Sequence, residues 1–210
     1  MKIAIIGAGN VGKALSGSFV RAGHDVTISS QHPDNARAAA AETGAKAAAT
    51  NAEAVPSAEV VVLAVPYGAL ADVVDELGDA LTGKVVVDAT NPLRPDYQGL
   101  AVEGTSAAEQ VQARVKGAKV VKAFNTALAA RQADPLVDGT PLDAFVAGDD
   151  EQAKATVMEL ARSIGFHPID AGPLELARAL EALALLNIML QIRNNWTWQT
   201  GWKLVGPTSA

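Results

Sequence analysis

Short runs of β-branched residues alternate with longer alanine-rich segments along most of the chain. The apolar runs predict strands at residues 2–6, 25–29, 45–49, 59–65, 84–89, 118–122, 142–147 and 166–170. Apolar residues at helical spacing predict helices at residues 11–22, 33–43, from 67 onward, 106–116, 151–164 and about 174–196. The run VVVLAV at 60–65 is apolar on both faces, which is typical of a buried parallel strand. The pattern predicts an α/β fold, a doubly wound parallel sheet with helices on both faces.

The regular alternation ends after the predicted strand at 118–122. Two further strands, a helix and a long final helix follow, with no low-complexity linker between them. We therefore expect a first domain at residues 1–124 and a small C-terminal α/β lobe at residues 125–210 that ends in the long helix. The lobe would pack against the first domain and form a substrate cleft with it.

Composition narrows the possible functions. The chain has 210 residues, 49% of them apolar, which suits one sizeable domain with a small appendage. Its net charge of -6 argues against a nucleic-acid partner, because phosphate binding needs a basic face. The absence of cysteine excludes disulfides, iron–sulfur clusters and thiolate zinc sites, and it suits a reducing, cytoplasmic compartment. The three histidines are widely spaced, so no metal site is expected.

The chain also lacks the signals of membrane proteins. The N-terminal apolar run covers only residues 3–6, too short for a signal peptide. No stretch reaches the roughly 20 apolar residues of a membrane span. We expect no membrane partner.

A glycine-rich turn lies between the first predicted strand and the first predicted helix. It comprises Gly7, Ala8, Gly9, Asn10, Val11 and Gly12. The first glycine permits a tight turn, the second lets the backbone approach a pyrophosphate, and the third lets the helix pack close to the strand. The helix N-terminus then presents free N–H groups to the phosphates. In this strand–turn–helix context the motif predicts a Rossmann-type dinucleotide site.

The tip of the second strand bears on the choice of cofactor. An NAD site usually places a carboxylate there to bind the ribose 2′-hydroxyl. Here Ser30, Gln31 and His32 follow the strand, and Asp34 suits a helix N-cap. A carboxylate would repel a 2′-phosphate, whereas hydroxyl and amide groups do not. We therefore expect an NADP pocket formed by Ser30, Gln31, His32 and Asn35, with Arg37 as a candidate source of positive charge. NAD remains open, because no arginine occupies the tip itself.

Six motifs occur in a characteristic order along nearly the whole chain. They are GAGNVGKAL at 7–15, AVPY at 64–67, DATNP at 88–92, KAFNT at 122–126, AGDD at 147–150 and DAGPLELARALEALALLNI at 170–188. Together they resemble the NADPH:coenzyme F420 oxidoreductase family, the deazaflavin-dependent NADP reductases. The cytoplasmic domain of the STEAP-type ferric reductases is similar.

The resemblance implies a location for each part of the cofactor. Residues 8–11 would contact the pyrophosphate, and Ser30, Gln31 and Asn35 would hold the 2′-phosphate. The nicotinamide side and the reacting ring would be lined by Val65, Pro66, Tyr67, Asn91, Pro92, Phe124 and Asn125. A deazaflavin (coenzyme F420) or a flavin would occupy the cleft between the two parts of the chain, and a homodimer is expected.

Two departures from the family bear on specificity. The family often carries Arg beside the serine at the second-strand tip, where this chain has Gln31. The segment at 191–204, QIRNNWTWQTGWKL, replaces an end that is usually rich in glycine and methionine. It holds all three tryptophans, which would either wall a flat ring or pack against a lobe or a second subunit.

Hydride transfer between two stacked rings depends mainly on proximity and orientation, so no catalytic acid or base is expected. Two alternatives stay open. Reduction of a small imine or carbonyl would need a proton donor, for which Tyr67 and Lys122 are the candidates. A non-catalytic NADP-binding sensor would need only the nucleotide site.

The assignment of the 2′-phosphate is testable by adding the carboxylate that the strand tip lacks. In Ser30→Asp and Gln31→Asp variants, repulsion of the phosphate should weaken NADPH binding by about tenfold or more. The measurement is a fluorescence titration with NADPH, with NADH as the control ligand. An undiminished affinity for NADPH would refute the placement.

Overall fold

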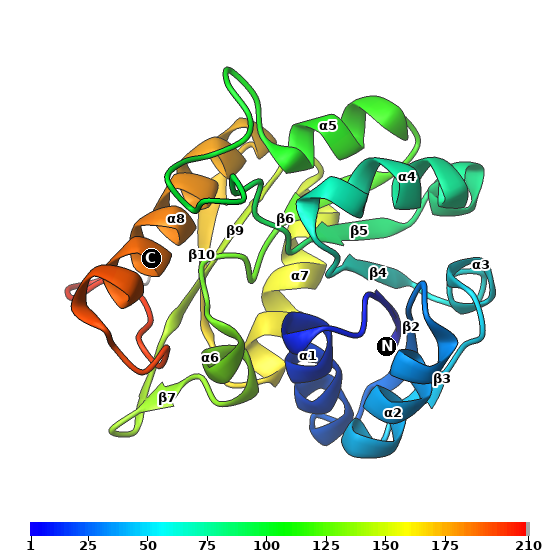
Figure 1. The fold of residues 1–210 in the computed structure, drawn as a ribbon, viewed down its shortest axis with the longest axis horizontal. Helices are drawn as coiled ribbons and strands as arrows, with labels where there is room; N and C mark the ends of the chain where they lie inside the picture. Colours follow the sequence, from blue (N-terminus) through cyan, green and yellow to red (C-terminus); the bar gives the residue numbers. More distant parts are fainter. Residues whose placement is uncertain (209–210) are drawn as a thin grey trace.

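The computed structural model describes residues 1–208, which form one eight-stranded sheet with helices on both faces (Figure 1). In spatial order the strands are β10 (His167–Gly172), β9 (Asp143–Gly148), β6 (Lys119–Lys122), β5 (Val85–Asp88), β4 (Val60–Leu63), β1 (Lys2–Ile6), β2 (Asp25–Ser29) and β3 (Lys46–Ala47). All neighbours pair in parallel except β6 and β9, which pair antiparallel. The expected α/β fold with a doubly wound, mostly parallel sheet is confirmed.

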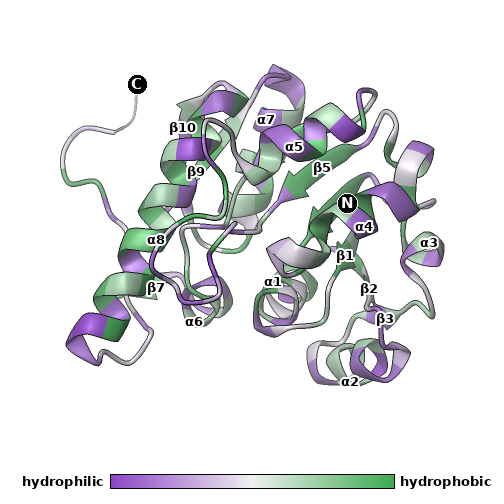
Figure 2. Cartoon of the chain, turned by 45° about the horizontal axis from the view of Figure 1, so that its top comes forward, coloured by the Kyte–Doolittle hydropathy of each residue, from purple (hydrophilic) through white to green (hydrophobic). Residues whose placement is uncertain are grey.

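The helices cover the sheet in two layers. They are α1 (Asn10–Arg21), α2 (Pro33–Thr43), α3 (Asn51–Ala54), α4 (Tyr67–Leu77), α5 (Ala107–Arg114), α6 (Ala129–Ala133), α7 (Glu151–Ser163) and α8 (Ala177–Asn194). One core lies on the face of the sheet covered by α1, α2 and α7, and a second core lies under α4 and α5. Figure 2 shows apolar central strands and helices in which apolar and hydrophilic stretches alternate. None of the helices in the described part of the chain has the length and apolar character needed to cross a bilayer.

The structure refines the predicted elements at their ends. The strand predicted at 59–65 covers only Val60–Leu63, because Ala64 and Val65 leave the sheet before Pro66. The long final helix begins as a 3-10 turn at Leu174–Leu176 and continues as α8. The four-residue α3 and the small hairpin of β7 (Leu136–Val137) and β8 (Thr140–Pro141) are too short to show a periodic pattern.

Strands β9 and β10 extend the sheet of the first part of the chain. Val121 and Lys122 of β6 face Gly148 and Ala147 of β9 in antiparallel register. Helix α8 then crosses beside these strands toward the end of the chain (Figure 1). The division into residues 1–124 and 125–210 remains a prediction.

Residues 195–204 form a segment, here called the C-terminal strap, that returns along the lobe after α8. Asn195 reverses the chain in a left-handed conformation, with φ 51°. The backbone N–H of Trp198 donates to the Gln191 side-chain oxygen at 3.0 Å, and the Trp202 carbonyl accepts the backbone N–H of Asp143 at 2.9 Å. Trp196 and Trp198 are each 46% exposed, so these two rings lie at the surface of the isolated chain.

Asp143 holds the end of the strap. Its buried carboxylate accepts hydrogen bonds from the Leu204 N–H, the Lys203 ammonium at 2.8 Å and the His167 ring at 2.8 Å. Burial alone would raise the pKa of Asp143, but these hydrogen bonds together outweigh burial and lower the pKa below its usual range. A carboxyl with a lowered folded-state pKa stabilises the fold above its unfolded pKa of about 3.9, and this stabilisation is lost as pH falls through the folded pKa.

Replacement of Asp143 should therefore have a pH-dependent cost. We expect Asp143→Asn to lower stability near pH 7 by about 2 kcal/mol, the scale of hydrogen bonds to a charged group, and to lower the melting temperature accordingly. The difference from the wild type should shrink as the pH falls below about 4, because the carboxyl is then protonated in the unfolded state before it is protonated in the folded state. Thermal melts across this pH range measure it, and a constant difference would contradict the role of the charge.

Candidate functional site

The predicted site residues follow five parallel strands at their carboxyl ends. The glycine turn follows β1, Ser30 follows β2, Val65 follows β4, Asn91 follows β5 and Phe124 follows β6. Parallel strands bring these ends to one edge of the sheet, and the strand order changes direction at β1, between β2 and β4. Such a switch point opens a crevice in which open α/β sheets bind ligands.

The glycine turn has the geometry of a phosphate-binding loop. Gly7 has φ +115°, and a Cβ there would lie 2.3 Å from the Ala64 carbonyl oxygen. A Cβ on Gly12 would lie 1.9 Å from the Gly7 carbonyl oxygen, so α1 can approach β1 only without a side chain there. A Cβ on Gly9 would meet nothing within 4 Å. No side chain caps α1, which leaves its first N–H groups available to an anion above Gly9.

A cavity of about 530 Å³ opens beside this loop. The predicted residues that line it are Gly7, Ala8, Gly9, Ser30, Gln31, His32, Asn35, Val65 and Pro66. The remaining wall comes from residues that the sequence analysis missed: Ala49, Thr50, Asn51, Ala64, Ala69, Asp72, Val73 and Glu76. Four of them recur at helical spacing on α4, so the apolar pair Ala69 and Val73 could have been found as one face of the helix that follows β4.

Side chains at the tip of β2 form a polar rim. The Ser29 hydroxyl donates to Asn51 at 2.9 Å, and Asn51 donates to Glu76 on α4 at 3.0 Å. Helix α2 begins after His32, and Asp34 lies within its first turn, so the expectation that Asp34 caps this helix is wrong. Arg37 forms an ion pair with Asp34 one turn earlier. A 2′-phosphate at Ser30 and Gln31 would therefore compete with Asp34 for Arg37.

Two asparagines bridge the loops that follow β5 and β6. Asn91 donates to the Asn125 carbonyl at 2.9 Å, and Asn125 donates back to the Asn91 side-chain oxygen at 2.9 Å. The Asn125 amide also donates to the Leu180 carbonyl on α8 at 3.1 Å. Its own side-chain oxygen is buried and has no partner among the described residues. The amide pair thus connects two loops of the crevice to the C-terminal helix.

The other predicted residues of this region differ in how they face the crevice. Phe124 has φ 64° and a buried ring that packs edge-on against Phe19, with centroids 5.9 Å apart. Its carbonyl already accepts hydrogen bonds from the Gln132 side chain at 3.0 Å and the Ala127 N–H at 3.2 Å, so Phe124 shapes the loop from within. The Tyr67 hydroxyl donates to Gln110 on α5 at 2.9 Å. Tyr67 is not among the residues that line the cavity beside the glycine turn. The same holds for Asn10, Val11, Gly12, Asn91, Pro92 and Asn125.

Lys122, the other candidate proton donor, is fully buried. Its ammonium lies 2.9 Å from Asp88 and 2.7 Å from Glu181 on α8. Neither this amine nor the Tyr67 hydroxyl is placed as a free proton donor at the crevice. The arrangement lends no support to general-acid chemistry on a carbonyl.

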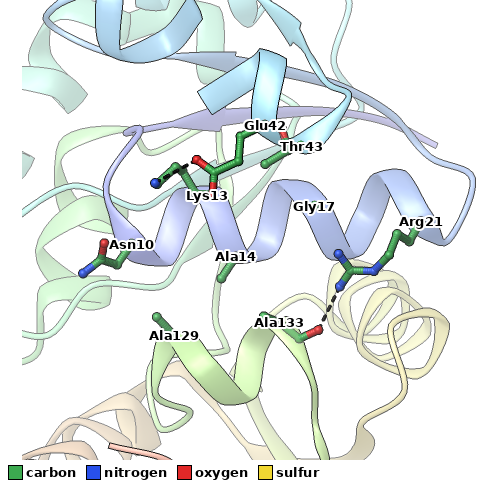
Figure 3. Close-up of a pocket in the computed structure, with 9 residues that line it drawn as sticks. All are labelled: Asn10, Lys13, Ala14, Gly17, Arg21, Glu42, Thr43, Ala129 and Ala133. Carbon is green, nitrogen blue, oxygen red and sulfur yellow. Dashed lines mark hydrogen bonds and ion pairs between the residues drawn. The ribbon is translucent and has the colours of Figure 1, made fainter. Parts of the chain in front are cut away.

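A second hollow, of about 560 Å³, lies between α1, α2 and α6 (Figure 3). Asn10 is the one predicted site residue in its lining. Lys13 is paired with Glu42 at 3.0 Å on one side, and Arg21 donates to the Ala133 carbonyl at 2.8 Å on the other. The hollow runs along the flank of α1 and has no glycine turn, so the cavity at the sheet edge is the better fit for a dinucleotide.

Comparison with known proteins places these features in a family. The family described as NADP oxidoreductase, coenzyme F420-dependent, matches residues 2–92. The F420-dependent NADP reductase of Methanothermobacter thermautotrophicus is 36% identical over 211 residues, which span 92% of this chain and 90% of that protein. A solved structure from Arthrobacter sp. FB24, provisionally assigned as an F420-dependent NADP reductase, superposes with a TM-score of 0.88 at 32% identity, covering 98% of this chain and 100% of that one.

A second kind of relative shares only part of its length with this chain. The metalloreductase STEAP3 of Rattus norvegicus is 36% identical over 188 residues. The match spans 88% of this chain and 36% of that protein. The chain thus spans about a third of STEAP3 but nearly the whole of the archaeal reductase.

The glycine geometry predicts opposite effects for two similar substitutions. Gly12→Ala should destabilise the fold by about 3 kcal/mol or more, because backbone lies where the Cβ would be. Gly9→Ala should leave stability within about 0.5 kcal/mol of the wild type, since its φ of -78° suits alanine and the space is open. It should nonetheless weaken NADPH binding by about tenfold, because the methyl group occupies the approach of the pyrophosphate.

Thermal melts and NADPH titrations separate the two effects, and each variant serves as the control for the other. A Gly9→Ala variant that binds NADPH as the wild type does would show that the pyrophosphate lies elsewhere.

Proposed function

The chain belongs to the family of F420-dependent NADP reductases, and on this premise we propose that it transfers a hydride between NADPH and coenzyme F420. The chain covers 90% and 94% of two archaeal members, so the relation extends over both the sheet and the C-terminal lobe. NADP and the deazaflavin are its two redox substrates, and the protein is an oxidoreductase.

The observation that carries the proposal is the cavity beside the glycine turn. It brings together an uncapped helix N-terminus, the open space above Gly9 and the polar side chains of Ser30 and Gln31. These are the requirements of a pyrophosphate and a 2′-substituted ribose. The residues present therefore fit a bound NADP.

We assign the cofactor contacts to the residues that the sequence predicts for them. The N–H groups of residues 8–12 would hold the pyrophosphate, and Ser30, Gln31, His32 and Asn35 the 2′-phosphate. Val65, Pro66 and Tyr67 would line one side of the nicotinamide, with the bridged pair Asn91 and Asn125, Pro92 and the loop at Phe124 on the other. NADPH, when bound, supplies the hydride; the protein holds the acceptor ring in the cleft against it and excludes water.

This chemistry needs no protein acid or base at the reacting carbon. The Tyr67 hydroxyl is bonded to Gln110, and Lys122 is buried in ion pairs, which suits a reaction driven by ring placement. The proton that accompanies F420 reduction comes from solvent. We also assign residues 1–124 as the NADP domain and residues 125–210 as the lobe that forms the other side of the cleft. We expect the protein to lie in the cytoplasm.

We also propose a homodimer through the C-terminal lobe. Leu186 and Ile192 on α8 are each 49% exposed, and Trp196 and Trp198 follow directly on the strap. Figure 2 shows apolar stretches along α8. An apolar surface rimmed by polar residues is typical of a protein interface.

The activity is tested by following NADPH oxidation with coenzyme F420, flavin mononucleotide and a ferric chelate in parallel. We expect turnover with F420 at about 1–10³ s⁻¹. The Gly9→Ala variant should lose activity at low NADPH and serves as the matched control. Tight NADPH binding without oxidation by any of these acceptors would contradict an enzymatic role and favour a sensor.

A further inference from the structure

A buried charge cluster lies behind the loops of the crevice. It consists of Lys122 at the end of β6, Asp88 at the end of β5 and Glu181 on α8, and all three side chains are fully buried. The Lys122 ammonium makes three hydrogen bonds: to Asp88 at 2.9 Å, to Glu181 at 2.7 Å and to the Thr90 carbonyl at 2.7 Å. An ammonium has three N–H donors, so each is used.

The two carboxylates extend the cluster to neighbouring segments. Asp88 accepts the Thr90 N–H at 2.9 Å and the Thr90 hydroxyl at 2.7 Å, which fixes the turn that leads to Asn91. Glu181 accepts the N–H of Ala107, the first residue of α5, at 2.9 Å. One lysine thus holds together the turn after β5, the end of β6, the start of α5 and the middle of α8.

The cluster adjoins the asparagine pair. Thr90 directly precedes Asn91, and Leu180, whose carbonyl accepts the Asn125 amide, directly precedes Glu181. The turn on the nicotinamide side and the helix on the acceptor side are therefore tied to the same ammonium.

Stability alone gives little reason to bury these charges. Desolvation of ions is costly, and a buried ion cluster is often no more stabilising than apolar side chains of the same volume. Burial raises the pKa of Glu181, and the attraction of Lys122 does not cancel this effect. One oxygen of Glu181 is left without a partner among the described residues. Such groups are retained in some proteins because they fix one geometry.

We propose that Lys122 is a positioning residue that sets the separation between the nicotinamide-side turn at Thr90–Pro92 and α8, and with it the distance between the two redox rings. The inference rests on the proposed hydride transfer. The adenosine half of NADPH would bind at the tip of β2, away from the cluster, so its affinity should not depend on Lys122. Hydride transfer should depend on it strongly, since a displacement of about 1 Å can cost about 100-fold in rate.

Two variants remove the ammonium in different ways. Lys122→Met leaves two buried carboxyls without their cation. The triple variant Asp88→Asn/Lys122→Met/Glu181→Gln is free of buried charge, and its amide oxygens can still accept the N–H groups of Thr90 and Ala107. It covers the case in which the single variant fails to fold. Lys154→Met is the matched control, because Lys154 is also buried and bridges two carboxylates, Glu151 and Asp170, on α7 and β10.

Three measurements are made on each folded variant and on the wild type. They are the affinities for 2′,5′-ADP and NADPH, the amide hydrogen exchange of residues 88–93, and the single-turnover rate of hydride transfer to coenzyme F420 with 4-protio and 4-deuterio NADPH. We expect an unchanged 2′,5′-ADP affinity, faster exchange in 88–93, a rate lower by about 100-fold and an altered isotope effect. Lys154→Met should match the wild type in all of them.

The outcomes separate the two proposals. A wild type that binds NADPH but reduces no F420 would refute the proposed function, while the exchange data would still report whether Lys122 fixes the turn. An active wild type with Lys122 variants as fast as Lys154→Met would overturn the positioning role. So would a uniform loss of 2′,5′-ADP affinity and rate together, because it would show a general structural effect.

Discussion

The parallel direction of five neighbouring strands is the constraint on which the site depends. Because β2, β1, β4, β5 and β6 end at the same edge, loops that are far apart in the sequence meet there. The close approach of Gly12 to the Gly7 carbonyl then places the N-terminus of α1 at that edge, directly over the switch in strand order. A pyrophosphate bound at this point would be neutralised by N–H groups and the helix dipole rather than by basic side chains. This explains how an acidic chain can bind a highly charged cofactor.

Polar contacts hold the predicted C-terminal lobe against the loops that follow β5 and β6. Strand β9 joins the sheet antiparallel to β6, so α8 returns beside the loops that follow β5 and β6. Asn125 donates to the Leu180 carbonyl on α8, and Lys122 pairs with Glu181 on the same helix. At the far end of α8, Gln191 and Asp143 hold the strap that carries the tryptophans. Hydrogen bonds thus fix α8 at its middle and at its end. These bonds are directional, whereas apolar packing is not.

The sequence predicted most of the fold, because the central strands β1, β4 and β5 are nearly uninterrupted apolar runs and the longer helices show helical spacing. It also predicted the half of the site that is local in the chain: the glycine turn needs only residues 7–12, and the β2 tip only residues 30–35. It missed the α4 wall at Asp72 and Glu76, whose role depends on how a helix is rotated against the sheet. It also misjudged Lys122, because burial of a lysine depends on two carboxylates, one of them 59 residues away in the chain. Such long-range partners leave no periodic signal.

The central claim is that the fold serves to hold two rings in contact, so that hydrogen moves directly between them. The most direct measurement uses NADPH carrying deuterium at the transferred position of C4, with coenzyme F420 in ordinary water, and determines the isotopic content of the reduced deazaflavin by mass spectrometry. The account predicts that one deuterium per turnover is recovered in the reduced deazaflavin. Loss of the label to solvent would contradict direct transfer and require an exchangeable group of the protein between the two rings.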